Sequence, residues 1–312
     1  MIEFENISKI YGKISVVDSV TMTVPARTIT TIVGTSGSGK STLMRMVNRL
    51  IEPSSGVIRI DGQDISGLSP YELRRRIGYV IQNNGLFPHY TISENIGTVP
   101  KLLGWPRERI KRRVDELLDL FQLEAGVYAK RYPHQLSGGQ QQRVGVARAL
   151  AAEPNILLMD EPFGALDPII RALANKNLLE IQKRFETTIL LVTHDIEEAI
   201  QLGDQVAVMD KGRLLQHSPP KDLLFNPASN FVEELVGTGA KAYRLLSLKK
   251  LKDMVEAGTA DGPPLSVELS LKEALSDLLW YKRSELPVID LHGHIIGRVL
   301  LSSILNFASG PL

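Results

Sequence analysis

Short apolar segments rich in β-branched residues recur along the amino-terminal part of the chain. They lie at Thr28–Val33, Val57–Ile60, Ile77–Ile81, Ile156–Met159, Thr188–Val192 and Gln205–Met209. Runs of this length and composition are typical of buried strands, and several are separated by segments with helical periodicity. This alternation of strands and helices predicts an α/β fold built on a sheet with parallel strands.

Between about Leu86 and Gln135 the strand pattern is absent, and helical periodicity takes its place. The segment Arg107–Phe121 is the clearest case. Its apolar residues fall at helical spacing, at Ile110, Val114, Leu117, Leu118 and Phe121. We therefore expect a helical lobe inserted into the sheet domain.

The pattern changes again at Gly237-Thr238-Gly239-Ala240, which predicts two domains, residues 1–237 and 238–312. Beyond this break, Ser270–Tyr281 has one apolar helical face. Two further strand-like runs, Leu286–Asp290 and Ile295–Val299, flank a turn at Gly293. The second domain is therefore expected to be small and of the α+β class.

Composition narrows the classes of partner and of site. The chain has 312 residues, enough for one large and one small domain, and its 36 basic and 35 acidic residues leave a net charge of +1. Proteins that bind nucleic acid usually carry a strongly basic stripe, so no nucleic-acid partner is expected. The absence of cysteine excludes disulfides and thiolate metal sites.

No targeting or membrane-spanning segment is evident in the sequence. Residues 1–6 are neither basic nor followed by an apolar stretch, as a signal peptide would be. A spanning helix needs about 18 consecutive apolar residues, and no window approaches that length. We expect a chain that is soluble and cytoplasmic, or peripheral to a membrane.

The segment that follows the Thr28–Val33 run contains the most specific chemistry in the chain. It matches the Gly-x-x-x-x-Gly-Lys-Ser/Thr loop, in which glycines turn backbone N–H groups toward phosphates. Lys40 adds a charge near the β and γ phosphates, and Ser41 offers a hydroxyl to Mg²⁺. The predicted contacts to a nucleoside triphosphate are Gly34, Ser36, Gly37, Ser38, Gly39, Lys40, Ser41 and Thr42.

Two carboxylates end the buried run Ile156–Met159, at the edge of a parallel sheet where ligands bind. Asp160 is suited to hold Mg²⁺ through water, and Glu161 to orient or deprotonate an attacking water. Together with the phosphate-binding loop, these two residues predict hydrolysis of the bound triphosphate.

A second anion site is predicted at the start of a helix that runs to about Ala152. Ser137 is a favourable N-cap, and Gly138 and Gly139 leave the first backbone N–H groups uncovered, with Gln140 next in the chain. One nucleotide does not need two such sites from one chain. We therefore expect each chain to lend this site to the nucleotide of a second copy, in a homodimer.

These motifs resemble those of the ATP-binding subunit of an ABC transporter, in the order that the family has them across residues 1–236. The resemblance implies a P-loop NTPase core, with Gln82 touching Mg²⁺ and facing a membrane subunit. It also implies that His194 contacts the γ-phosphate, that Ala165–Asp167 lies at the dimer seam and that Tyr11 stacks on adenine. The implied catalytic residues are Glu161, His194 and Gln82, and the implied metal contacts are Ser41, Gln82 and Asp160.

The family includes importers, exporters and soluble ATPases, and this chain looks most like a bacterial importer subunit. The stretches Ile81–Ile96 and Val99–Trp105 are similar to importers of quaternary amines such as glycine betaine, carnitine or choline. The resemblance implies an ATPase that uses Mg²⁺, pairs with permease subunits at the cytoplasmic face of the inner membrane, and serves a substrate-binding protein indirectly. An importer of another solute, such as an amino acid, and a soluble non-transport ATPase remain alternatives.

The helix, strand, turn and strand of the second domain resemble a single CBS motif. Such motifs pack in pairs, so the partner motif is expected from a second chain. In members of that family that bind adenosine nucleotides, Thr or Ser and Asp contact phosphate and ribose. Leu300 and Ser303 stand at those positions here. We therefore expect a regulatory or dimerising domain that binds ligand weakly or not at all.

Overall fold

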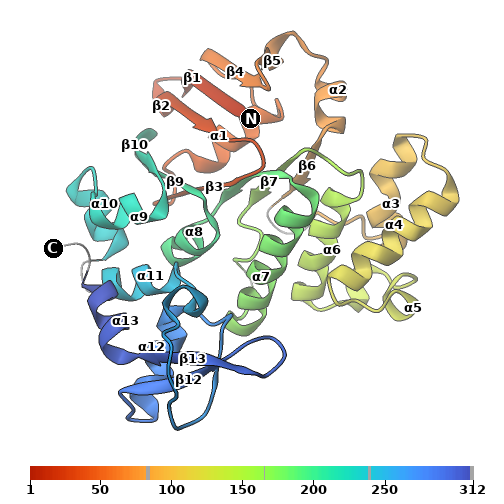
Figure 1. Cartoon of the computed structure of the whole chain (residues 1–312). Helices are drawn as coiled ribbons and strands as arrows, with labels where there is room; N and C mark the ends of the chain where they lie inside the picture. The colour runs from red at the N-terminus through yellow and green to blue at the C-terminus, as the bar shows by residue number, and fades with distance from the viewer. Residues whose placement is uncertain (82–84, 165, 238–239, 310–312) are drawn as a thin grey trace. The chain divides into compact units, whose positions relative to one another are not determined.

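The computed structural model describes residues 1–81, 85–164, 166–237 and 240–309 (Figure 1). The chain divides into two compact units, Met1–Pro220 and Lys221–Leu312. This division falls earlier in the chain than the boundary predicted after residue 237. Helix α10 (Asn230–Val236) consequently belongs to the second unit.

A six-stranded sheet forms the centre of the first unit, in the order β10-β9-β3-β8-β7-β6. Its strands are β3 (Ile29–Gly34), β6 (Ile77–Val80), β7 (Ile156–Asp160), β8 (Thr188–Val192), β9 (Gln205–Asp210) and β10 (Arg213–Ser218). The strands from β9 to β6 are parallel, and β10 pairs antiparallel with β9. The predicted parallel α/β sheet is confirmed.

A second, antiparallel sheet has the order β2-β1-β4-β5. It contains β1 (Ile2–Tyr11), β2 (Ile14–Val24), β4 (Ser55–Ile60) and β5 (Gln63–Asp64). The apolar run Val57–Ile60 is a strand as predicted, but it pairs with β1 here and does not join the parallel sheet. An apolar run signals a strand without identifying its partner, and β1 and β2 had no place in the sequence prediction.

Helices surround these sheets (Figure 1). Those outside the lobe are α1 (Lys40–Val47), α2 (Pro70–Arg75), α6 (Gly138–Leu150), α7 (Pro168–Phe185) and α8 (Ile196–Leu202), with short 3-10 turns at Ile65–Gly67 (η1) and Pro133–Gln135 (η2). Between β6 and β7 the chain forms α3 (Ile92–Leu102), α4 (Arg107–Leu120) and α5 (Ala125–Tyr128). The predicted helical lobe is therefore present, and α4 buries the expected face at Val114, Leu117 and Leu118.

Two apolar cores cover the two faces of the parallel sheet. Alternate residues of β8 divide between them, because successive side chains of a strand point to opposite faces. Leu190 and Val192 pack with α1 and the antiparallel sheet. Ile189 and Leu191 pack with α6, α7 and the helical lobe. Helix α1 is thereby fixed between two sheets, with the predicted phosphate-binding loop at its amino-terminal end.

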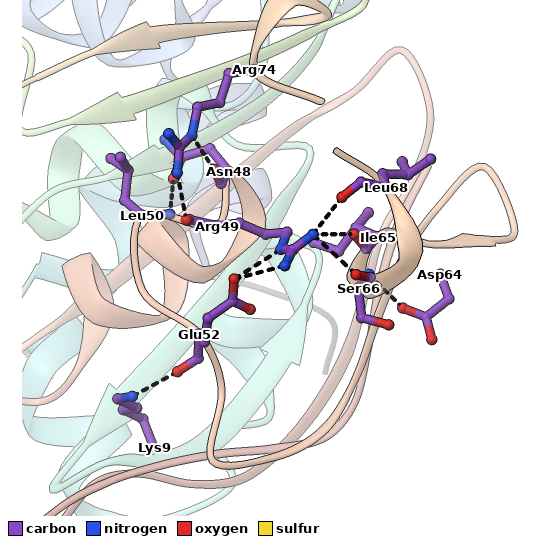
Figure 2. A network of polar contacts seen from close by, with 10 residues as sticks. All are labelled: Lys9, Asn48, Arg49, Leu50, Glu52, Asp64, Ile65, Ser66, Leu68 and Arg74. Carbon is purple, nitrogen blue, oxygen red and sulfur yellow. Dashed lines mark hydrogen bonds and ion pairs between the residues drawn. The ribbon is translucent and has the colours of Figure 1, made fainter. Parts of the chain in front are cut away.

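The carboxyl-terminal end of α1 is fixed by two arginines (Figure 2). Arg49 donates to the backbone carbonyls of Ile65, Ser66 and Leu68 at 3.2, 3.0 and 2.5 Å. Arg74 donates to the carbonyls of Asn48 and Arg49 at 3.0 and 2.7 Å. The two carbonyls that Arg74 reaches lie just beyond the last residue of α1, so Arg74 satisfies this end of the helix and links it to α2, while the Arg49 bonds link it to the η1 segment.

The second unit has the element order predicted for it. After α9 (Pro220–Phe225) and α10 come α11 (Lys241–Ser247), η4 (Leu251–Met254), β11 (Leu265–Ser266), α12 (Leu271–Trp280), β12 (Glu285–Ile289), β13 (Ile295–Leu300) and α13 (Leu301–Ala308). Strand β12 lies between β11, to which it is parallel, and β13, to which it is antiparallel. The predicted helix, strand, turn and strand are confirmed, whereas their assignment as a CBS motif stays a prediction.

Across the described ranges, no helix combines the length and the apolar character that crossing a bilayer requires.

Candidate functional site

The predicted site residues of the first unit gather at one edge of the parallel sheet. Strands β3, β8 and β7 are parallel neighbours, so their carboxyl ends lie together. The phosphate-binding loop follows β3, His194 lies two residues beyond β8, and Asp160 ends β7. The register pairs Asp160 with Val192, which places Glu161 beside the segment that leads to His194.

Two glycines of the loop are required by close backbone contacts. A Cβ atom on Gly34 would lie 1.9 Å from the carbonyl oxygen of Met209, and one on Gly39 would lie 2.4 Å from that of Val16. Gly39 is also the N-cap of α1 and has a φ of 93°, in the left-handed region that favours glycine. Because Gly39 has no side chain, the first N–H groups of α1 remain open to an anion.

The residues of the loop differ in their exposure to solvent. Ser36 and Gly37 are exposed, Ser38 is buried beneath them, and Ser41 and Thr42 are partly buried in the first turn of α1. This arrangement leaves an exposed backbone rim above a buried interior. Such a rim is suited to bind phosphate oxygens through N–H groups.

Lys40 is almost fully buried inside the loop, at 6 % exposure. Its Nζ donates to the carbonyls of Gly34 and Thr35 at 2.9 and 2.7 Å. Burial lowers the pKa of Lys40, while the nearby charges of Glu161 and Asp160 oppose that shift. The ammonium group is thus held by neutral partners in a poorly solvated place, where a phosphate would be a stronger partner.

Asp160 is fully buried and has a donor on each carboxylate oxygen. Ser41 Oγ donates to Oδ1 at 2.7 Å, and an Arg45 Nη donates to Oδ2 at 3.2 Å. A hydroxyl and a carboxylate are the oxygen ligands that Mg²⁺ takes in phosphate sites, so these residues fit the predicted metal. Arg45 was missed from the sequence, although its i,i+4 spacing from Ser41 places both on one face of α1.

Glu161 has a backbone conformation that is uncommon for a residue with a side chain. Its φ is 48°, and its N–H donates to the carbonyl of Val192 at 2.9 Å, which ties it to β8. His194 Nδ1 lies 3.4 Å from Glu161 Oε2. Both side chains reach solvent, with 27 % exposure for Glu161 and 58 % for His194. The pair therefore stands at an accessible edge beside the loop.

The predicted second anion site is a fully formed helix cap. Ser137 Oγ accepts from the N–H of Gln140 at 3.3 Å, and Gln140 Oε1 accepts from the N–H of Ser137 at 2.9 Å. The Gln140 side chain also donates to the Tyr128 hydroxyl at 3.0 Å, so its amide already has partners within the chain. The Ser137 hydroxyl is used as an acceptor, which leaves its hydrogen available for an anion.

Arg171, which the sequence reasoning missed, joins the two loops that flank the site. It donates to the carbonyl of Leu166 at 3.1 Å and to the side chain of Asp195, next to His194, at 3.3 Å. Asp167 caps α7 by accepting from the N–H groups of Ile169 and Ile170. The segment predicted to lie at a dimer seam is therefore tied to the histidine loop.

Tyr11 lies at the end of β1 and is 49 % exposed. The Lys9 ammonium is 4.9 Å from its ring centroid. The ring stands on the hairpin whose second strand contributes Val16, the residue that closely approaches Gly39. The predicted stacking of Tyr11 on adenine stays a prediction. Gln82 and Ala165, also predicted as site residues, lie outside the described ranges.

Comparison with known proteins gives the same family for the whole set of motifs. Residues 17–164 match the family model described as ABC transporter. The glycine betaine uptake system ATP-binding protein YehX of Escherichia coli K12 is 46 % identical over 98 % of this chain and 99 % of its own length. The glycine betaine/carnitine/choline transport ATP-binding protein OpuCA of Bacillus subtilis 168 is 44 % identical over 96 % of this chain and 78 % of its own length.

A solved structure agrees with this assignment. The ATP-binding cassette MJ0796, in a dimeric post-hydrolysis state bound to ADP and phosphate, superposes with a TM-score of 0.64 and 32 % identity. The match covers 70 % of this chain and 99 % of the MJ0796 chain. Together with the phosphate-binding loop, the carboxylate pair at the end of β7 and the capped glycine pair of α6, these matches show that the chain is an ATP-binding protein of the ABC transporter family.

Proposed function

We propose that this chain is the ATP-hydrolysing subunit of an importer that takes up quaternary amines of the glycine betaine, carnitine and choline class. The observation that supports this proposal most strongly is the sequence identity of 46 % with a relative named for glycine betaine uptake, over 98 % of the chain. That match extends beyond the ATP-binding unit into the second unit. A relative named for all three amines is also similar over 96 % of the chain.

In the proposed reaction, the loop Gly34–Thr42 binds the phosphates of ATP through its backbone, and Lys40 supplies a positive charge to the β and γ phosphates. Glu161 accepts a proton from water, whose oxygen attacks the γ-phosphorus. The bond from that phosphorus to the bridging oxygen breaks, and ADP and phosphate leave. His194, 3.4 Å from Glu161, would stabilise the charge on the transferring group together with Lys40.

Ser41 and Asp160 would hold Mg²⁺, Asp160 through water, with Gln82 assigned to the same metal by its position in the motif set. When bound, the ion neutralises charge on the phosphates. The hydrogen bond from Ser41 to Asp160 at 2.7 Å supports this assignment, because it leaves the Ser41 oxygen lone pairs available to a cation.

The proposed active unit contains two copies of the chain. Ser137, Gly138 and Gly139 of one copy would close over the phosphates bound by the other, with Ser137 donating the hydrogen that its own helix cap does not use. The dimeric state of the matched MJ0796 structure supports this proposal. Permease subunits would be driven through the Gln82 segment at the cytoplasmic face of the membrane, with a substrate-binding protein acting on the far side.

For the second unit we propose a dimerising or regulatory role as a single CBS-like motif. Ser303, at the position expected to contact a ribose, already donates to a Glu256 carboxylate oxygen at 2.6 Å. Leu300 is the N-cap of α13 and offers no hydroxyl to a phosphate. Both observations support a unit that does not depend on nucleotide binding.

Uptake by the reconstituted complex tests the proposed cargo. Proteoliposomes that contain this chain and its permease subunits, loaded with ATP, are offered labelled glycine betaine, carnitine, choline and an amino acid. We expect ATP-dependent accumulation of at least one quaternary amine, and its loss in a complex with Glu161→Gln. Accumulation of the amino acid alone would overturn the cargo, and purification of an active ATPase that binds no permease would overturn the importer.

A further inference from the structure

We infer that Arg45 is a positioning residue of the metal site, which sets the Mg²⁺ affinity of the ATP-bound chain by fixing the carboxylate of Asp160. This inference rests on the proposed roles of Ser41 and Asp160 in holding the metal. It concerns the nucleotide site alone and is independent of which solute is imported.

The geometry divides the Asp160 carboxylate between two donors of α1. Ser41 Oγ lies 2.7 Å from Oδ1, and the Arg45 guanidinium nitrogen lies 3.2 Å from Oδ2. Because the two donors hold different oxygens, Arg45 does not compete with Ser41 for the same position. The two bonds together fix the rotation of the carboxylate about its Cβ–Cγ bond.

The direction of the Ser41 hydrogen bond gives this positioning a chemical consequence. A hydroxyl has one hydrogen and two lone pairs, and here the hydrogen points to Asp160. The lone pairs are therefore directed away from Asp160 and remain free for a cation. If the carboxylate rotated, the hydroxyl would lose its fixed acceptor and could turn its hydrogen toward the metal position.

Asp160 needs such a partner because it is completely buried. A buried carboxylate without a partner is strongly unfavourable, so the groups that pair with it determine its orientation. In the part of the chain that the structure describes, the hydrogen bonds to its side chain come from Ser41 and Arg45. Lys40, the other nearby cation, donates its hydrogen bonds to the carbonyls of Gly34 and Thr35.

Arg45 is itself held from the neighbouring strand β6. A side-chain hydrogen bond with Tyr79 raises the pKa of Arg45, and burial raises the pKa of Tyr79. Arg45 therefore interacts with Tyr79 as well as with Asp160. The positioning chain runs from Tyr79 through Arg45 and Asp160 to Ser41.

The test is a titration of the full-length chain with Mg²⁺ in the presence of a fluorescent ATP analogue. Hydrolysis is blocked by Glu161→Gln in every variant, so the readout is binding. For Arg45→Met we expect the half-saturating Mg²⁺ concentration to rise about 10-fold, as for loss of other groups that orient metal ligands. Affinity for the analogue in EDTA is expected to stay unchanged, because Arg45 acts through Asp160 and not on the nucleotide.

Three further variants distinguish positioning by Arg45 from a general effect of lost charge or lost stability. Tyr79→Phe should raise the half-saturating Mg²⁺ concentration in the same direction by a smaller factor. Arg45→Lys keeps the charge but loses the planar fork, so an intermediate shift is expected, and it carries the test if Arg45→Met does not fold. Arg59→Met removes a surface arginine paired with Glu5 on the antiparallel sheet, and should match the parent.

Ser41→Ala distinguishes failure of this inference from failure of the proposed site. If Ser41→Ala shifts the Mg²⁺ titration while folded Arg45→Met and Arg45→Lys titrate like the parent, the role of Arg45 is overturned and the site stands. An equal loss of affinity in EDTA and in Mg²⁺ for Arg45→Met would also overturn it. If Ser41→Ala leaves the titration unchanged, the metal site itself is wrong and the inference falls with it.

Discussion

The two ends of helix α1 use the same kinds of donor for different purposes. At the carboxyl-terminal end, Arg49 donates to three backbone carbonyls of the η1 segment, and Arg74 donates to the carbonyls of Asn48 and Arg49. At the amino-terminal end, Lys40 also donates to carbonyls, but it stands in a loop whose exposed rim is open to an anion. The donors at the carboxyl-terminal end keep their partners within the fold. We expect Lys40, at the amino-terminal end, to exchange its carbonyl partners for phosphates when a nucleotide binds.

The two ends of α1 show that residues a few positions apart can serve either the stability of the fold or the binding of ATP. Arg49 is paired with Glu52 at 2.9 Å, so its charge has a fixed counterpart within the fold (Figure 2). The charge of Lys40 has neutral hydrogen-bond partners, and burial lowers the pKa of its ammonium group. Groups at the carboxyl-terminal end should therefore contribute to the free energy of unfolding, and groups at the amino-terminal end to the affinity for ATP.

The largest expected effect lies beside the amino-terminal end of α1. Glu161→Gln should lower the ATP hydrolysis rate by about 10²- to 10⁴-fold, the range that a general base supplies. Binding of ATP and the unfolding temperature should stay close to those of the parent, because the amide has the same shape as the carboxylate. Phosphate release measured beside equilibrium ATP binding checks this, and a variant with unaltered turnover would remove Glu161 from the mechanism.

Lys40→Met should lower ATP affinity by about 10- to 100-fold, the value of a hydrogen bond to a charged group. The unfolding temperature should be unchanged or higher. The folded pKa of Lys40 is lowered, so burying its charged form costs folding free energy, and the variant removes that cost. Calorimetric titration with ATP and thermal unfolding measure the two effects. Loss of stability with intact ATP affinity would place Lys40 with the structural end.

Arg49→Met should show the opposite pattern. Its side chain is 15 % exposed and its guanidinium donates to three carbonyls, so its loss should lower the free energy of unfolding by about 2 to 3 kcal/mol. ATP affinity of the folded protein should not change. Urea unfolding and ATP titration of the same preparation test this, and a fall in ATP affinity without a fall in stability would break the contrast between the two ends.

Glu52→Gln is expected to have the smallest effect. The Glu52 side chain is 55 % exposed, and half-exposed ion pairs contribute about 0 to 1 kcal/mol. The variant should therefore unfold at slightly lower urea than the parent and less easily than Arg49→Met. If it matched Arg49→Met, the ion pair would outweigh the carbonyl bonds at this end of α1.

The site was predictable from sequence where local geometry dictates the residue. Gly34 and Gly39 have backbone contacts that leave no room for a Cβ atom, so the loop is visible as a spacing of glycines. Ser137 was visible for a similar reason, because a helix start needs an acceptor for its own N–H groups. Each of these constraints acts within a few residues of the position it fixes.

The parts that were not predicted depend on partners far apart in the chain. The apolar run Val57–Ile60 would have the same sequence whichever strand it paired with. Only the folded structure shows that its partner is β1. The ion pair of Arg45 and Asp160 joins residues 115 positions apart. A side chain on α1 has many candidate partners, and choosing Asp160 requires knowing that β7 lies beside the helix.

We propose that the loop Gly34–Thr42 forms half of a nucleotide site that a second copy completes through Ser137–Gly139. Disulfide crosslinking tests this shared site, because the chain has no cysteine of its own and a Cβ atom on Gly138 would meet nothing within 4 Å. The full-length Glu161→Gln chain carries Ser36→Cys and Gly138→Cys, and is oxidised with and without saturating ATP. We predict a covalent dimer with ATP and none without it. A chain saturated with ATP that forms no crosslink would contradict the shared site.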